Sequence, residues 1–120
     1  MIYVNFLYIW SMQRRILTYG GYFERFIQTL TRKELEKVEY VLSLLETEDK
    51  LPVKFIKYIQ DDLFELRVMY SGKIFRVFFI FDQDRIVVLF NGFQKKTRKT
   101  PKGEIEKALK IKAAYYERKR

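Results

Sequence analysis

Two arginines at facing positions of a predicted β-hairpin are the side chains best suited to chemistry in this 120-residue sequence. Residues 63–70 and 73–81 alternate apolar and polar side chains, and the Ser-Gly dipeptide between them is typical of a two-residue turn. Counting outward from that turn sets Arg67 directly across from Arg76 on one face of the hairpin. Because opposed like charges are destabilising, we expect something to offset the repulsion. A bound phosphate fits, since guanidinium groups bind its oxygens bidentately.

The same register supports the predicted hairpin, but a bound phosphate is not the only way to relieve the repulsion between the two arginines. It places three apolar pairs on the opposite face, as a sheet packed on a core requires. These pairs are Val68 with Phe75, Leu66 with Val77, and Phe64 with Phe79. The repulsion between the two arginines is also relieved if both are solvated, or if Glu65 or an aspartate bridges them.

Further cations flank the hairpin. Lys54 and Lys57 precede it in the sequence, at a short predicted strand over residues 55–59. After Gly92 comes a polar segment, predicted as a loop. It supplies four candidate RNA-binding residues, Lys95, Lys96, Arg98 and Lys99. If that loop folds over the polar face of the sheet, five or more cations converge on one surface.

Charge balance and missing residue types narrow the chemistry. The chain contains no Cys and no His, which excludes disulfides, thiolate metal sites and imidazole catalysis. No Gly-rich phosphate loop and no common zinc or EF-hand spacing occurs, so we expect neither a metal nor another cofactor. The net charge is +9, and residues 94–120 carry 11 Lys and Arg against 3 Asp and Glu. Such a segment favours a polyanionic partner, although a run of charge is also typical of a solvated helix face.

The elements that must position these cations predict an α+β domain with two N-terminal helices, a small twisted antiparallel sheet and a C-terminal helix. Thr31, with Glu34 three residues on, predicts a capping box at the start of the second helix. A last helix is expected to begin at Thr100-Pro101. A short strand is predicted at residues 14–19, and the strands of the predicted meander lie at residues 55–59, 63–70, 73–81 and 85–93.

The two ends of the chain are interpreted separately. We expect residues 14–120 to form the domain and residues 1–13 to be an N-terminal extension or an extra strand. No stretch reaches the roughly 18 apolar residues of a transmembrane helix, and we expect a cytoplasmic protein without a membrane partner. The final helix could lie on a membrane surface, but its apolar stripe is more simply explained by packing on the core. That stripe consists of Ile105, Ala108, Leu109 and Tyr116.

Five short blocks follow one another after residue 62 in a distinctive order and spacing. They read LFELR from Leu63, FR at Phe75, GFQKKT from Gly92, KTP from Lys99 and EIEKA from Glu104. In these blocks the sequence resembles HigB-type toxins of the RelE/ParE superfamily, in its phage-derived branch. With less support from the helical half, the resemblance extends over about residues 14–118.

The resemblance implies a fold of the microbial ribonuclease type and a toxin of a type II toxin–antitoxin system. Such a toxin is an endoribonuclease that cleaves mRNA, usually on the ribosome, and is neutralised by a helix-turn-helix antitoxin from the same operon. Carried over by position, Arg67 and Arg76 are the first candidates for catalysis, followed by Lys57, Lys54 and Lys96.

Two departures from the family pattern leave the acid–base assignment open. Asn91 stands where His is common, and Phe75 stands where Tyr is common. Our hypothesis is metal-independent attack by the 2′-hydroxyl of the RNA, with arginines stabilising the charge on the phosphate. Without His, the base would be a lysine whose pKa neighbouring cations lower, and Lys54 or Lys57 is the candidate.

Two rival functions remain at this point. A nucleic-acid-binding module without catalysis would bind phosphates through the same basic segment, and it would leave RNA intact. A gyrase-poisoning toxin, as known in the ParE branch, would cause DNA damage without mRNA cleavage. The KKT block favours the ribonuclease branch, by resemblance only.

Overall fold

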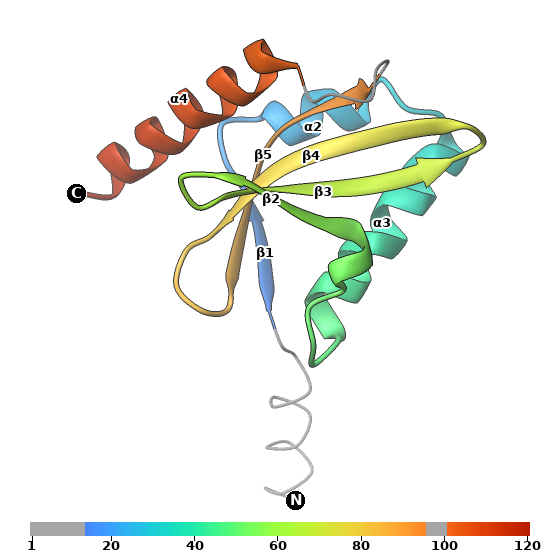
Figure 1. Cartoon of the computed structure of the whole chain (residues 1–120), viewed down its shortest axis with the longest axis horizontal. Helices are drawn as coiled ribbons and strands as arrows, with labels where there is room; N and C mark the ends of the chain where they lie inside the picture. Colours follow the sequence, from blue (N-terminus) through green and yellow to red (C-terminus); the bar gives the residue numbers. More distant parts are fainter. Residues whose placement is uncertain (1–13, 96–100) are drawn as a thin grey trace, which may run out of the picture.

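A five-stranded sheet carrying helices on both faces forms the domain in this computed structural model, which describes residues 14–95 and 101–120 (Figure 1). The α+β class predicted from the sequence is confirmed. In chain order the elements are β1 (Arg15–Thr18), α2 (Tyr22–Ile27), α3 (Arg32–Thr47), the 3₁₀ turn η1 (Val53–Phe55), β2 (Ile56–Gln60), β3 (Leu63–Tyr70), β4 (Lys73–Phe81), β5 (Ile86–Lys95) and α4 (Lys102–Lys119).

The sheet is mixed, whereas the sequence predicted an antiparallel one. Its strand order is β1-β5-β4-β3-β2, and β2 to β5 form the predicted antiparallel meander. β1 adds to the outer edge of β5 in parallel, from Arg15 beside Ile86 to Thr18 beside Leu89. This pairing joins segments about 70 residues apart, so no local pattern in the sequence encodes it.

The register of the central hairpin is confirmed. Arg67 lies opposite Arg76, and the three predicted apolar pairs also match. Ser71 and Gly72 both have positive φ, 50° and 78°, as a type I′ turn requires. That turn has the twist of the strands it joins, and this fixes the register.

Alternation along the strands divides the apolar side chains into two cores. One core packs α2 and α3 against Leu66, Val77 and Leu89 on one face of the sheet. The other packs α4 against Phe78 and Phe90 on the opposite face. Because α4 covers only part of its face, the remainder of that face is available for polar side chains.

The ends of the helices show which of the predicted capping residues are present. Thr31 and Glu34 form the predicted capping box at the start of α3. At α4, Pro101 is the N-cap and not the first helical residue, and Thr100 lies outside the described residues. The apolar stripe of α4 also differs from prediction: Tyr115 packs on the core, while Tyr116 is 39 % exposed.

No helix in the described part of the chain is long and apolar enough to cross a membrane. Residues 1–13, predicted as an extension or extra strand, lie outside the described residues.

Candidate functional site

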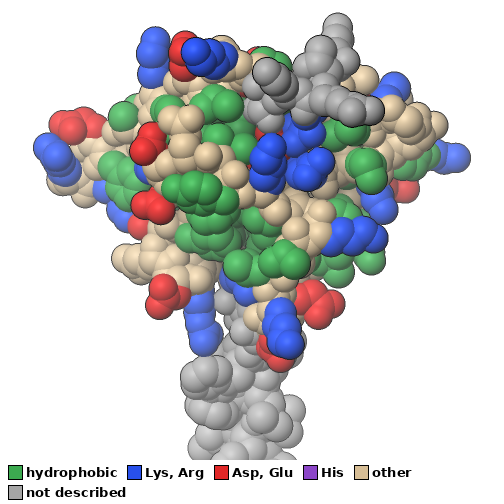
Figure 2. Space-filling model, in the orientation of Figure 1, with side chains coloured by type: hydrophobic (Ala, Val, Ile, Leu, Met, Phe, Trp, Pro, Cys, Tyr) green, Lys and Arg blue, Asp and Glu red, His purple; other side chains and the backbone are tan. Residues whose placement is uncertain are grey.

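Five charged side chains share the end of the sheet face that lies beyond α4, and we call them the charged cluster: Lys57, Glu65, Arg67, Arg76 and Lys95. Lys57 on β2 lies beside Glu65 on β3, and Arg67 on β3 lies beside Arg76 on β4. Figure 2 shows Lys and Arg side chains gathered over the middle of the sheet, where β3 and β4 run, with hydrophobic side chains beside them. Four cations around one carboxylate leave this surface strongly positive.

The two facing arginines differ in environment because their strands differ in position. Arg76 is on β4, between β3 and β5, and it is 1 % exposed. Arg67 is exposed, since pairing between β2 and β3 ends at Ile56 and Leu66, one residue short of it. The alternation of side chains along the two strands predicts that both arginines lie on one face, but it does not predict that one is buried and the other exposed.

Glu65 offsets the repulsion at Arg76. Nη1 of Arg76 donates a hydrogen bond to Oε1 of Glu65, whose side chain is fully buried. The bridge by Glu65, one of the offsets that the sequence left open, is therefore present in the free protein. Arg76 lies beneath the surface in this pair, whereas Arg67 is exposed, and phosphate binding by both arginines stays a prediction. Arg67 forms no salt bridge with a carboxylate among residues 14–95 and 101–120.

Lys95 belongs to the cluster because β5 is longer than predicted. The sequence placed it in a loop, yet β5 continues to Lys95, which lies beside Ile74 of β4. Only 8 % of Lys95 is exposed. Burial first, and then the positive charges of Arg76, Lys57 and Arg67, lower the pKa of Lys95, while Glu65 acts in the opposite direction. A buried ammonium group among like charges loses its proton more readily than a free lysine.

Lys54 lies at the border of the cluster, in η1, with its ammonium nitrogen 5.4 Å from the ring centre of Phe55. Together with Arg67 it lines a cleft at the edge of the sheet. Of the other predicted RNA-binding residues, Lys96, Arg98 and Lys99 lie outside the described residues. The structure therefore brings Lys57, Arg67 and Lys95 together at one surface, with Lys54 next to it.

Comparison with models of known protein families shows to which family this chain belongs. The sequence matches the family described as "Phage derived protein Gp49-like (DUF891)" over residues 25–113, or 89 of its 120 residues. The chain belongs to this family. Gp49-like proteins are toxins of the toxin–antitoxin type related to the RelE-like fold, and this implies an antitoxin partner. No curated protein matches the sequence significantly.

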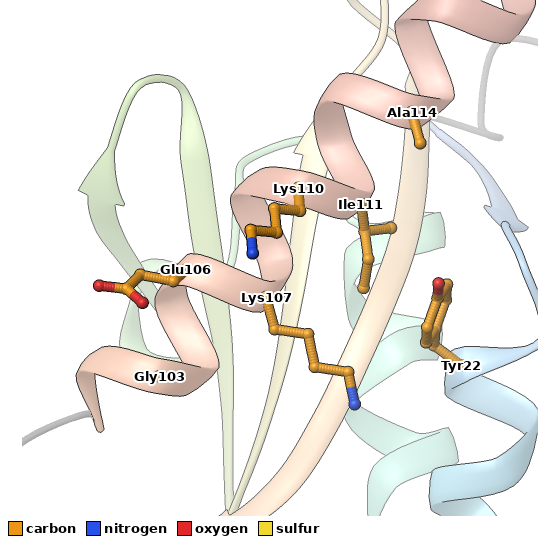
Figure 3. Close-up of a pocket in the computed structure, with 7 residues that line it drawn as sticks. All are labelled: Tyr22, Gly103, Glu106, Lys107, Lys110, Ile111 and Ala114. Carbon is orange, nitrogen blue, oxygen red and sulfur yellow. The ribbon is translucent and has the colours of Figure 1, made fainter.

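A second groove of the Gp49-like domain lies between α2 and α4 (Figure 3). Lys107 points from α4 toward Tyr22, and its nitrogen is 5.7 Å from the centre of that ring, whereas Glu106 points the other way. No member of the charged cluster lines this groove. We therefore place the candidate site of this Gp49-like protein at the cluster and not at the groove.

Sequence reasoning missed two features of the site. Lys37, on α3, lines the cleft beside Arg67, and it was not predicted as a site residue from the sequence. No local signal marks it, because a lysine on an amphipathic helix is normally just solvated. The burial of Lys95 was the second, and the only sequence signal was its position two residues beyond Phe93, in phase with the buried side of β5.

Proposed function

We propose that this Gp49-like protein is the toxin of a type II toxin–antitoxin pair and that it acts as a metal-independent endoribonuclease on mRNA. The observation that carries the proposal is the charged cluster, in which a buried lysine with a lowered pKa lies beside an exposed arginine and four cations surround one carboxylate. Perturbed titratable groups of this kind concentrate at catalytic sites. The HigB-like blocks of the sequence support the same activity by resemblance.

In the proposed reaction, each side chain has one task. Arg67 binds the non-bridging oxygens of the scissile phosphate and stabilises the charge that builds on them in the transition state. Lys95, in its neutral form, takes the proton of the ribose 2′-hydroxyl. The 2′-oxygen then bonds to phosphorus while the bond to the 5′-oxygen breaks. The products are a 2′,3′-cyclic phosphate and a 5′-hydroxyl.

The remaining members of the cluster support these steps. Lys57, exposed on the same face, is our candidate for the donor that gives a proton to the leaving 5′-oxygen. The sequence favoured Lys54 or Lys57 as the base, but burial and neighbouring charges point to Lys95 instead. Arg76 acts as a positioning residue, because its pair with Glu65 fixes the charge pattern beneath Lys95 and Arg67.

The proposed partners follow from the family and the charge. We propose that mRNA is cleaved on the ribosome, in the cytoplasm, and that a helix-turn-helix antitoxin from the same operon neutralises the toxin. The neighbouring reading frame is expected to encode such a protein.

The test is inducible expression followed by mapping of mRNA 5′ ends, for the wild type, for Arg67→Ala and for Lys50→Ala. Lys50 lies in the exposed turn after α3 and carries the same charge, so it is the matched control. We expect new 5′ ends with the wild type and the control, and about 10²–10³-fold less cleavage with Arg67→Ala. Intact mRNA with the wild type would contradict the ribonuclease proposal. DNA damage signalling would then favour gyrase poisoning, and RNA binding without cleavage would favour a binding module.

A further inference from the structure

A cleft at the edge of the sheet extends the charged cluster toward α3. Five residues from three elements line it: Lys37 of α3, Lys54 and Phe55 of η1, and Arg67 and Met69 of β3. Its volume is ≈ 250 Å³, about that of eight water molecules at ~30 Å³ each. Arg67 belongs both to this cleft and to the charged cluster, so the two are continuous.

All the charged side chains that line the cleft are positive. Lys37, Lys54 and Arg67 contribute three cations, and no carboxylate from the described residues lines the cleft. Lys37 is half-buried on α3, with its nitrogen 5.3 Å from the ring centre of Tyr40. Three cations around one small concavity, without a counter-charge, favour an anion with several oxygens.

The apolar part of the lining suits a nucleotide better than an inorganic anion. Phe55 contributes a partly buried ring over which the ammonium group of Lys54 lies, and Met69 contributes a thioether side chain that is 64 % exposed. Aromatic rings stack on bases regardless of sequence, and methionine adapts to flat, irregular partners. A basic groove combined with such surfaces is the usual arrangement for single-stranded nucleic acid.

We propose that this cleft is a second RNA subsite, in which Lys37 and Lys54 bind the phosphate next to the scissile one and Phe55 and Met69 contact the attached nucleoside. The proposal rests on the proposed function, since it takes RNA as the substrate held by Arg67. In it, the RNA strand runs from Lys95 across Arg67 toward α3. Lys37 binds substrate without taking part in bond cleavage.

The test is the salt dependence of RNA binding. A 12-nucleotide 2′-O-methyl RNA lacks the attacking hydroxyl, so its fluorescence anisotropy reports binding alone. Four proteins are compared between 50 and 300 mM salt: wild type, Lys37→Ala, Lys37→Arg and the control Lys50→Ala. Each lost phosphate contact lowers the magnitude of the log–log slope by about 0.7 for a single strand.

We expect Lys37→Ala to lower that magnitude by about 0.7 and to weaken binding about two- to fivefold, in the range of an exposed ion pair. Lys37→Arg should retain the wild-type slope, as should Lys50→Ala. Equal slopes for Lys37→Ala and Lys50→Ala would overturn the subsite. Cleavage of unmodified mRNA by the wild type is scored separately. If the wild type cleaves mRNA but Lys37→Ala leaves the slope unchanged, only the subsite is overturned. If the slope depends on Lys37 but the wild type does not cleave mRNA, only the ribonuclease proposal is overturned.

Discussion

Replacing Glu65 by Gln removes the only carboxylate of the charged cluster and leaves its four cations. Glu65 and Arg76 are both almost completely buried, so the carboxylate compensates a guanidinium that water cannot reach. Removing one partner of a buried ion pair costs about 3–5 kcal/mol, because the other charge stays buried without compensation. We expect Arg76→Met to cost less than Glu65→Gln, since Lys95 still lies close enough to Glu65 to interact with it.

The size of the effect makes it easy to measure. Unfolding entropy for a chain of this length is about 0.25 kcal/mol per degree, so a loss of 3–5 kcal/mol lowers Tm by about 12–20 °C. Exchanging both partners for apolar residues, in Glu65→Leu/Arg76→Met, should leave stability nearly unchanged or raise it. The order of stability expected is therefore double variant, then Arg76→Met, then Glu65→Gln.

Thermal unfolding followed by circular dichroism gives this order directly. A second readout is the pH profile of RNA cleavage. Because Glu65 raises the pKa of Lys95, Glu65→Gln should move the rising limb of that profile to lower pH. If Glu65→Gln unfolds within about 3 °C of the wild type, or is more stable than the double variant, the pair is not the buried ion pair that our argument requires.

Three further predictions concern the base, the core and the acid stability of the domain. Lys95→Arg keeps the charge but cannot lose a proton near neutral pH, so cleavage should fall about 10²–10⁴-fold and lose its rise with pH; unchanged pH dependence would exclude Lys95 as the base. Gly92→Ala would bring a Cβ to within 2.5 Å of the Phe26 ring, and chemical denaturation should show a loss of about 1–3 kcal/mol. The pKa of Asp82 is lowered, first by the hydrogen bond from Lys119, so its stabilisation is complete above the ordinary pKa of 3.8 and is lost as pH falls through the lower folded value. Asp82→Asn should therefore flatten the acid limb of a stability-against-pH curve, and an unaltered limb would refute this assignment.

Local chemistry explains the parts of the fold that sequence predicts well. The Ser71-Gly72 turn and the alternation around it determine the pairing of Arg67 with Arg76, because both act within a few residues. The capping box of Thr31 and Glu34 is also local. Parallel addition of β1 is different, because the edge of β5 exists only after the rest of the sheet has formed.

The same division applies to the site. Residue type and the register of the hairpin bring Arg67 and Arg76 to one face, and the sequence contains both. Lys57 joins them through the pairing of β2 with β3, for which no register was predicted. Burial depends on how many strands flank a position, which the sequence does not state. Arg76 is therefore enclosed while Arg67 is open. Lys95 looks like part of a loop because polar residues surround it, although pairing with β4 keeps it in the sheet.

The last turn of α4 helps to hold this helix against the sheet. Tyr115 and Lys119 both donate hydrogen bonds to Asp82, in the turn between β4 and β5, and burial together with Asp82 raises the pKa of Tyr115 to about 12. Arg120 follows one residue later. An affinity tag or reporter joined directly after Arg120 would disturb the hydrogen bonds to Asp82 that hold α4 against the sheet. A fusion at this position therefore needs a flexible spacer.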